Sequence, residues 1–500
     1  MSPDQPPPVP ATAGPAQPAG PTGPAQPAGP TEPADDLVRT AHTLHVDGED
    51  RPYTATTGRI VLRREIHTDG TFDGHKPTAE LFVTAYTLDD APPGRPVTFA
   101  FNGGPGSSSV WLHLGLLGPR RVVMGDAGTL APPPYGLADN AQSLLAHSDL
   151  VFIDPVSTGY SRALAGGRPQ DFHGYTPDVE SVGELIRMWT SRHGRWMSPK
   201  YLCGESYGTT RAAALAQYLL ERFGLALNGV MLISAVLDFG TAEFGPDNDL
   251  PYLTYLPSYA AIAHHHGRHG DRPLAQVLAQ AQEFAAGEYA YVLDRGHRLD
   301  PARRTAAVAT LARLAGLDPD YVDRVDLRIE HIRFATELLR DRRRTVGRLD
   351  GRFLGWTADY GEERWSADPS YDAIRAPFSA AINHYARAEL GYHTDLPYEV
   401  LTDRVYPWSY REFENRHVSA ADRLAAAMRA NPHLRVYVAA GYHDLATPYA
   451  AAEHSLAHLR IPAQLRANIT VRYFEAGHMM YVHEPSRLAQ SAQLAEFVRA

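Results

Sequence analysis

Residues 200–224 read KYLCGESYGTTRAAALAQYLLERFG and carry the strongest structural signal in the chain. Lys200–Cys203 is typical of a short strand, and Thr209–Phe223 has helical spacing. Between them, GESYG (204–208) fits a tight turn from strand to helix, in which the small residues on either side of Ser206 relieve crowding. Because such a turn holds the hydroxyl clear of a sheet, we predict that Ser206 is a nucleophile and not an ordinary turn residue.

Strands and helices alternate on both sides of this turn. Short β-rich or continuously apolar runs predict strands at Thr54–Arg63, Thr78–Thr87, Pro96–Phe101, Asp149–Asp154, Gly229–Ser234, Leu434–Ala439 and Ile469–Phe474. Helical spacing predicts helices at Val179–Trp189 and Pro485–Val498. The alternation predicts an α/β protein with a mostly parallel central sheet that is covered by helices on both faces.

The sheet pattern is interrupted between residues 241 and 385. Leu274–Leu293 and Pro301–Ala315 have helical periodicity there, and buried β-runs are nearly absent. We expect residues 241–385 to form a mainly helical cap over the sheet. The α/β core would then consist of two parts, residues 37–240 and 386–500.

Composition places the chain among ordinary soluble proteins. A formal net charge of −10 and a pI near 6.1 do not indicate a basic surface that would bind nucleic acid or an anionic membrane. Residues 1–36 are a Pro/Ala-rich tract with too little apolar area to offset the entropy of ordering, which predicts a disordered tail. Cys203 is the one cysteine and is expected to be a buried strand thiol. With no signal peptide or transmembrane segment in view, we expect a cytoplasmic protein.

A nucleophilic serine needs a base, and the base needs an acidic partner that fixes its tautomer. In the α/β-hydrolase fold the chain order is Ser, then Asp or Glu, then His. Asp444 follows the Leu434–Ala439 strand and His478 follows the Ile469–Phe474 strand, so both stand where α/β folds place their sites. We predict a triad of Ser206, Asp444 and His478.

The segment NGGPGSSS (102–109) directly follows a predicted strand and is rich in glycine. Glycines let the backbone N–H groups approach developing negative charge, and the hydrolase oxyanion hole takes one N–H from such a loop and one from the residue after the nucleophile. This assigns the N–H groups of Gly104 and Tyr207. A phosphate-binding loop is the rival interpretation, but the Walker lysine and the G-x-G-x-x-G spacing are missing.

The clustered histidines and Asp154 could suggest further chemistry, but the sequence assigns neither of them a catalytic or metal-binding role. His264, His265, His266 and His269 form a cluster, but three consecutive histidines cannot all face one point on a helix, so we expect a helix end or a cleft rim and no metal. Asp154 precedes Ser206, against the chain order of the fold, and we place it in loop architecture. No organic cofactor is required by the predicted chemistry.

Five segments together resemble the serine carboxypeptidase family, and they occur in that family's order: NGGPGSSS (102–109), DPVSTGYS (154–161), GESYG (204–208), GYHDLATP (441–448) and AGHMMY (476–481). The resemblance covers roughly residues 50 to 500. It implies an α/β-hydrolase fold with a helical insertion, and release of C-terminal residues from peptides through an acyl-enzyme. It also implies that Asn102, Gly103, Glu205 and Tyr160 help to bind the substrate. A glutamate can hold a carboxylate only by sharing a proton with it, which gives an acidic working range a physical cause.

The chain departs from the family pattern at two positions. Leu116 stands where eukaryotic members carry a second carboxylate-binding glutamate, and Ser107 replaces a cysteine, which fits a bacterial-type member without disulfides. We therefore expect a serine peptidase of carboxypeptidase type that acts on peptides. An acyltransferase or esterase with the same triad is the alternative, and a catalytically silent binding protein is a third hypothesis. The sequence indicates no oligomeric state.

Overall fold

The computed structural model describes residues 32–46, 48–125, 128, 132–365 and 367–499. Asp35–Ala500 forms one compact unit, which is described here by itself. The tail that the sequence predicts to be disordered comprises residues 1–36, and its residues 1–31 lie outside the described residues. The first described strand, β1 (Asp36–Val46), begins at the end of that predicted tail.

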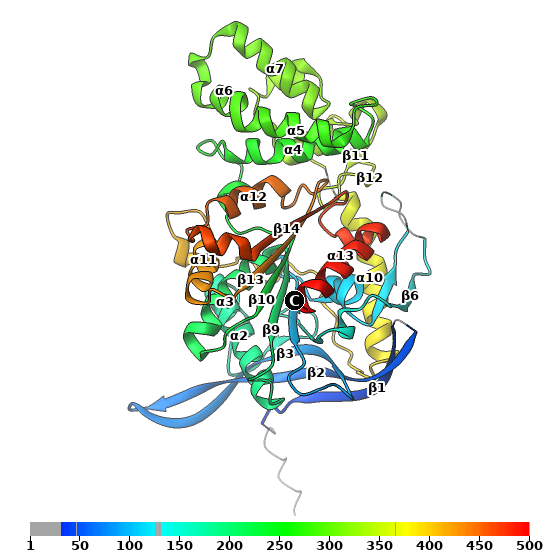
Figure 1. Cartoon of the computed structure of the whole chain (residues 1–500), viewed down its shortest axis with the longest axis vertical. Helices are drawn as coiled ribbons and strands as arrows, with labels where there is room; N and C mark the ends of the chain where they lie inside the picture. Colours follow the sequence, from blue (N-terminus) through cyan, green and yellow to red (C-terminus); the bar gives the residue numbers. More distant parts are fainter. Residues whose placement is uncertain (1–31, 47, 126–127, 129–131, 366, 500) are drawn as a thin grey trace, which may run out of the picture. The chain divides into compact units, whose positions relative to one another are not determined.

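A mixed sheet forms the centre of the unit (Figure 1). Among the described residues it has ten strands, in the order β1-β2-β3-β7-β4-β9-β10-β13-β14, with β8 paired to β3. The strands from β7 onward are parallel to one another, whereas β1, β2 and β3 are antiparallel. Their bounds are β2 Glu49–Thr68, β3 Thr71–Leu88, β4 Val97–Phe101, β7 Asp149–Ile153, β8 Arg162–Ala163, β9 Lys200–Glu205, β10 Gly229–Ile233, β13 Arg435–Gly441 and β14 Ile469–Phe474.

Helices cover both faces of this sheet, as the alternating sequence pattern predicts. The helices α2 (Tyr175–Arg192), α3 (Tyr207–Phe223) and α11 (Ala421–Ala430) pack on one face, in a core that includes Leu202 of β9. The opposite face belongs to a second core, which includes Cys203 and residues of α10 (Pro369–Ala388) and α13 (Glu484–Arg499). Successive residues of β9 therefore enter different cores, because side chains alternate across a strand. The α/β-hydrolase fold class predicted from the sequence is confirmed.

The chain between β10 and α10 is mostly helical and has a hydrophobic core of its own. Figure 1 shows α4, α5, α6 and α7 stacked together on the far side of α12 (Tyr449–Ala457). The helices of this part are α4 Leu250–His265, α5 Leu274–Phe284, α6 Ala290–Arg295, α7 Pro301–Ala315, α8 Pro319–Arg324 and α9 His331–Glu337. The short strands β11 (Thr345–Val346) and β12 (Leu354–Gly355) pair with each other. The domain limits stay predictions, and the limit at residue 385 falls inside α10, a helix that packs in a core of the sheet.

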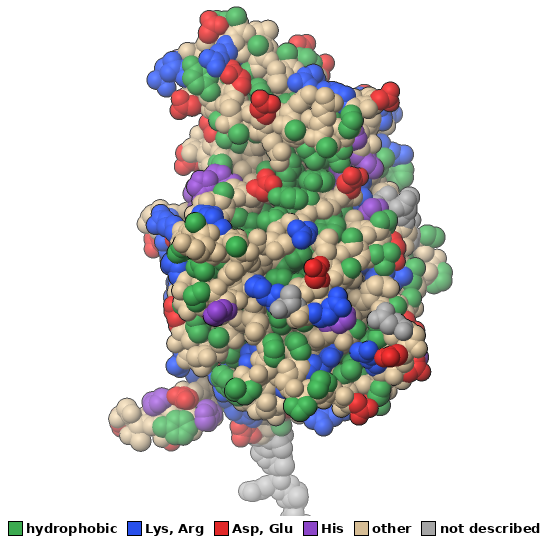
Figure 2. All heavy atoms as spheres, viewed as in Figure 1, with side chains coloured by type: hydrophobic (Ala, Val, Ile, Leu, Met, Phe, Trp, Pro, Cys, Tyr) green, Lys and Arg blue, Asp and Glu red, His purple; other side chains and the backbone are tan. Residues whose placement is uncertain are grey.

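The surface carries charges of both signs. On the face that Figure 2 shows, Lys and Arg side chains lie between Asp and Glu side chains, and no large area has a single sign. Within the described part of the chain, no helix combines the length and the apolar character that crossing a membrane requires.

Candidate active site

Ser206 occupies a strained turn between β9 and α3. Its backbone angles are φ 60° and ψ −130°, a region that non-glycine residues rarely adopt. Gly204 permits the turn, because a Cβ at that position would collide with the backbone carbonyl of Gly208. Backbone strain of this kind costs of order 1–3 kcal/mol and persists where the surrounding structure enforces it. The turn therefore has the tight strand-to-helix geometry expected from GESYG, and the role of Ser206 as nucleophile stays a prediction.

His478 and Asp444 come together from two different loops. Asp444 lies after β13 and His478 lies after β14, and His478 Nδ1 is 2.8 Å from Asp444 Oδ2. Asp444 is fully buried, and it also accepts hydrogen bonds from the N–H groups of Ala446 (2.7 Å) and Thr447 (3.0 Å) and from Thr447 Oγ1 (2.8 Å). Four donors thus satisfy the buried carboxylate and fix its orientation toward the imidazole.

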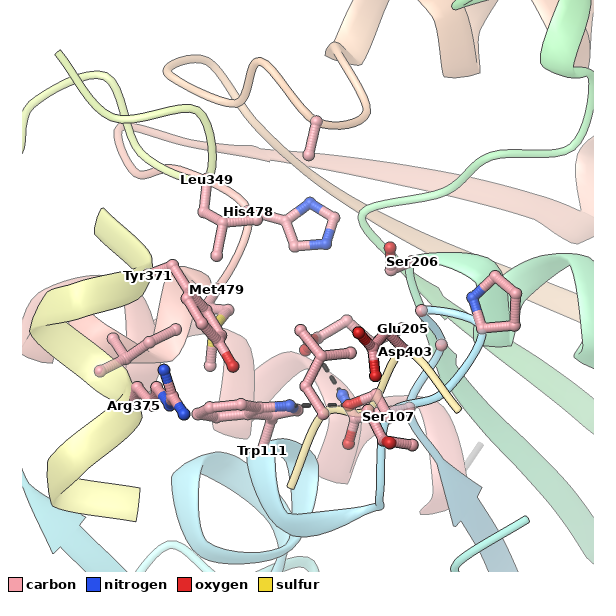
Figure 3. A pocket seen from close by; sticks show the side chains of 18 of the residues that line it. Ser107, Trp111, Glu205, Ser206, Leu349, Tyr371, Arg375, Asp403, His478 and Met479 are labelled. Carbon is pink, nitrogen blue, oxygen red and sulfur yellow. Dashed lines mark hydrogen bonds between the residues drawn. The ribbon is translucent and has the colours of Figure 1, made fainter. Parts of the chain in front are cut away.

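Ser206 faces the same pocket as His478. Figure 3 shows the imidazole of His478 pointing toward Ser206, and both side chains line a pocket of about 740 Å³. Within the described residues, no hydrogen bond joins the Ser206 hydroxyl to His478. In structures without substrate such bonds are often long, and they tighten when substrate closes the site. The structure thus brings Ser206 and His478 to one cavity, and Asp444, which is buried and does not line that cavity, is bonded to His478.

The pKa of His478 reflects its charged neighbours. Burial is the largest influence and lowers this pKa, but the charge and hydrogen bond of Asp444 and the charge of Glu205 outweigh it and raise the pKa above its ordinary value. The imidazolium that forms when Ser206 loses its proton is therefore stabilised, which is what a general base in a triad needs.

The backbone N–H groups of Gly104 and Tyr207 are the predicted oxyanion donors, and the structure brings the two segments that carry them together. Gly104 has φ 101°, which favours glycine, and Tyr207 is the first residue of α3, so its N–H has no partner within the helix. A Cβ on Gly103 would collide with the backbone nitrogen of Tyr207. The glycine loop and the start of α3 are thus pressed together, and Gly103 and Gly104 both line the pocket.

Glu205 and Asn102 form a buried pair beside the nucleophile. Asn102 Nδ2 donates to Glu205 Oε1 at 2.9 Å, and Asn102 Oδ1 accepts from the N–H of Leu112 at 3.1 Å. Tyr481 donates from its hydroxyl to Glu205 Oε2 at 2.7 Å. Burial is the largest influence on Glu205 and raises its pKa to about 7. Glu205 therefore carries a proton below neutral pH and can share it with another carboxylate.

Tyr160 does not line this pocket, and its role in substrate binding stays a prediction. Its side chain is fully buried and packs edge-on against Phe82 and Tyr398, with ring centroids 5.1 and 4.9 Å apart. Its hydroxyl accepts a hydrogen bond from Arg387 Nη1 at 3.1 Å. Aromatic packing in a separate cluster explains the residue without any contact to substrate.

The loops that carry His478 and Asp444 contact a segment of the predicted cap, residues 348–352. The N–H of His478 donates to the carbonyl of Leu349 at 2.6 Å, and the N–H of Gly351 donates to the carbonyl of His443 at 2.9 Å. Arg352 Nη1 donates to the carbonyl of Glu475 at 2.8 Å. Residues 348–352 thus contact both the loop that carries His478 and the loop that carries Asp444.

The clustered histidines lie at the end of α4 and beyond it. His264 contacts the carbonyl of Arg272 at 2.7 Å, and His266 contacts the carbonyl of Gly351 at 2.8 Å. In the part of the chain that the structure describes, no three His, Cys, Asp or Glu side chains converge as metal ligands would.

Comparison with known proteins points to one family. Residues 67–243 match the family model described as serine carboxypeptidase. The chain is 33% identical over 173 residues to the pheromone-processing carboxypeptidase KEX1 of Puccinia graminis f. sp. tritici, a match that covers 33% of this chain and 23% of that protein. It is 31% identical over 153 residues to serine carboxypeptidase-like 36 of Arabidopsis thaliana, which covers 30% of this chain and 29% of that protein. These matches span less than a third of the length of either relative.

A longer and weaker match extends the similarity over most of the chain. Serine carboxypeptidase-like 22 of Arabidopsis thaliana is 23% identical over 383 residues, which cover 75% of this chain and 73% of that protein. The crystal structure of Kex1(delta)p, a prohormone-processing carboxypeptidase from Saccharomyces cerevisiae, superposes with a TM-score of 0.55 at 15% identity. That superposition covers 89% of this chain and 91% of that chain, and it shows a shared fold.

Proposed function

We propose that this chain, whose residues 67–243 match the serine carboxypeptidase family model, is a serine-type carboxypeptidase that releases C-terminal residues from peptides. One observation carries the proposal. A buried carboxyl group, Glu205, lies directly beside the nucleophile Ser206, and both line the pocket that also holds His478. A catalytic serine explains acyl transfer, and the adjacent carboxyl group explains why a free C-terminus would be selected.

The acyl transfer follows from the geometry of the triad. His478 removes the proton of Ser206 as the hydroxyl oxygen attacks the scissile carbonyl, and Asp444 stabilises the imidazolium that results. The N–H groups of Gly104 and Tyr207 hold the negative oxygen of the tetrahedral intermediate, and such donors contribute on the order of 3 kcal/mol each. The imidazolium then gives its proton to the leaving amine. Water attacks the acyl-enzyme by the same proton route in reverse and restores Ser206.

Selection of a C-terminus rests on the proton of Glu205. Two carboxylates repel each other, but a protonated Glu205 can donate a hydrogen bond to the terminal carboxylate of a peptide, and Asn102 lies 2.9 Å from Glu205 to support it. Because burial brings the pKa of Glu205 to about 7, we expect peptides with a free C-terminus to bind best below neutral pH.

A matched set of substrates tests the proposal. A blocked dipeptide with a free C-terminus, its C-terminal amide and its C-terminal ester share the same internal peptide bond, so for cleavage of that bond they differ only in what Glu205 meets. Hydrolysis of the terminal ester instead acylates Ser206 with the whole blocked dipeptide and releases the alcohol. We expect efficient cleavage of the free acid by the wild type and none by Ser206→Ala. Cleavage of the ester alone would replace the carboxypeptidase proposal with the esterase or acyltransferase alternative. A wild type that a fluorophosphonate probe leaves unlabelled would indicate a silent scaffold.

A further inference from the structure

Tyr481 holds a fixed position three residues after His478. It lies in the short 3-10 turn η10 (Met480–Val482), and its side chain is 4% exposed. Its ring packs so closely against Gly115 that a Cβ at Gly115 would overlap ring carbon Cε2 of Tyr481. The hydroxyl points at Glu205 and donates a hydrogen bond to Oε2 at 2.7 Å. Packing therefore holds the phenol in one orientation, in which its hydroxyl donates a hydrogen bond to Glu205.

The carboxyl group of Glu205 has few hydrogen-bond partners among the described residues. Asn102 donates to Oε1 and Tyr481 donates to Oε2, and within the described residues no lysine or arginine forms an ion pair with this carboxyl group. The titratable groups that face it are Tyr481, His478 and Asp444, with the thiol of Cys203 nearby on the same strand. Tyr481 is thus one of two hydrogen-bond donors that decide how Glu205 is oriented and when it ionises.

We propose that Tyr481 is a positioning residue for recognition of the substrate's terminal carboxylate, and that it acts through Glu205; the inference rests on the proposed function. A second carboxyl group in the place of the phenol could bond to Glu205 only while the two shared a proton. A phenol keeps its proton throughout the working range, because burial and Glu205 raise the pKa of Tyr481 well above its ordinary value. Tyr481 can therefore bond to Glu205 in either protonation state, and it leaves the Glu205 proton for the substrate.

The effect of the phenol on Glu205 has a definite sign. Burial raises the pKa of Glu205, whereas hydrogen bonds from Tyr481 and Asn102 stabilise the charged form and lower the pKa. Tyr481→Phe removes one of these donors and leaves the ring, so the pKa of Glu205 rises. A hydrogen bond to a charged group corresponds to a shift of about one to two pKa units. Glu205 then keeps its proton to higher pH, and cleavage of a free peptide acid extends in the alkaline direction.

The test compares the pH dependence of kcat/KM for wild type and Tyr481→Phe. A blocked dipeptide acid reports on Glu205, and the corresponding amide, which has no terminal carboxylate, reports on the triad alone. We expect the alkaline limb for the acid to move upward by about one to two pH units and the alkaline limb for the amide to stay in place. An unmoved limb for the acid, or an equal shift for both substrates, would overturn the proposal.

Two controls separate this role from a general packing effect. Tyr289→Phe removes another buried phenol hydroxyl, which bonds to the carbonyl of Leu327 in the cap, and it should leave both profiles unchanged. In a Glu205→Gln background, Tyr481→Phe should no longer shift the profile, because the group that it acts on is gone. A shift of equal size in that background would overturn the proposal.

A spectroscopic titration keeps this inference distinct from the proposed function. The infrared carboxyl band that is present in wild type and lost in Glu205→Gln reports the ionisation of Glu205 directly, without turnover. We expect its midpoint to rise in Tyr481→Phe. An unmoved midpoint overturns the contact argued here even if peptides are cleaved, whereas a wild type that cleaves no peptide overturns the proposed function even if the midpoint moves.

Discussion

Asp350 of the cap accepts a hydrogen bond through Oδ2 from the backbone N–H of Gly477, 3.1 Å away and directly before His478, the proposed general base. The same carboxylate forms a buried ion pair with Arg352, whose Nη2 lies 2.6 Å from Oδ2. The side chains of Arg352 and Asp350 are 6% and 8% exposed. Asp350 therefore links the cap to the loop that places the general base, although it does not line the active-site pocket.

Asp350→Ala should weaken both the fold and catalysis. Removing one partner of a buried ion pair leaves the charge of Arg352 uncompensated, which typically costs about 3–5 kcal/mol. The His478 loop loses one of its contacts to the cap, so kcat should fall more than KM rises. Denaturant unfolding and steady-state kinetics measure the two effects. Asp350→Ala combined with Arg352→Met, which removes both charges, should recover part of the lost stability.

The contribution of Asp350 should also depend on pH. Burial is the largest influence and raises the pKa of Asp350, but the hydrogen bonds and charge of Arg352 outweigh it and hold the pKa below its ordinary value. Its stabilising effect is therefore present above the unfolded pKa and is lost as pH falls through the folded one. The stability difference between wild type and Asp350→Asn should be full at pH 7 and shrink below about pH 4. A difference that stays constant down to pH 3 would contradict this assignment.

Much of the fold could be predicted because its signals are local. The helix α7 begins and ends where the sequence predicts, since Pro301 starts it, Asp300 caps it and Gly316 ends it at φ 69°. The sequence pattern did not predict the helices α4 and α10. α4 contains Pro257 and α10 contains Pro377, and a proline inside a segment disfavours a helix when only the local sequence is considered.

The missed parts of the site have a different cause. The triad follows from chain order and strand ends, but the contact of Tyr481 with Glu205 joins residues 276 positions apart, which only the tertiary fold brings together. The contact of Asp350 with Gly477 spans 127 positions. Tyr481 is the last residue of the AGHMMY segment, so the sequence contained the residue but not its partner. The cytoplasmic location stays a prediction.

Ser206→Gly should make the protein more stable while abolishing activity. Glycine relieves backbone strain of about 1–3 kcal/mol at φ 60°, and the greater flexibility of the unfolded chain offsets about 0.5–1 kcal/mol of that gain. A net increase of about 1 kcal/mol in the free energy of unfolding is expected. Ser206→Ala is the matched control, because it also lacks the hydroxyl but keeps the strained Cβ. Equal stability of the two variants would show that the turn stores no strain.

Glu205→Gln should remove the alkaline limit on peptide cleavage. The amide of glutamine donates a hydrogen bond at every pH, whereas Glu205 donates only below its pKa of about 7. The pH optimum for a free peptide acid should therefore move from the acidic side toward neutral, as kcat/KM measured across the pH range will show. The corresponding peptide amide serves as the control: its alkaline side should stay in place, and its acid limb should move only downward, because the charge of Glu205 no longer raises the pKa of His478. An unchanged optimum for the acid would mean that Glu205 does not contact the substrate carboxylate.

Thr447→Val should shift the acid limb of activity upward. The hydroxyl of Thr447 donates to Asp444 Oδ2 at 2.8 Å and lies 3.2 Å from His478 Nδ1. This hydrogen bond partly neutralises the negative charge of Asp444, which would otherwise attract the imidazolium of His478 more strongly. Without this hydroxyl, Asp444 stabilises His478 in its charged form more strongly, and the pKa of His478 rises further above its ordinary value. His478 then becomes neutral only at higher pH, and the acid limb of kcat/KM should move upward by up to about one pH unit. Thr447→Ser keeps the hydroxyl and should behave as wild type. A downward shift in Thr447→Val would show instead that the hydroxyl serves mainly to hold the imidazole in place.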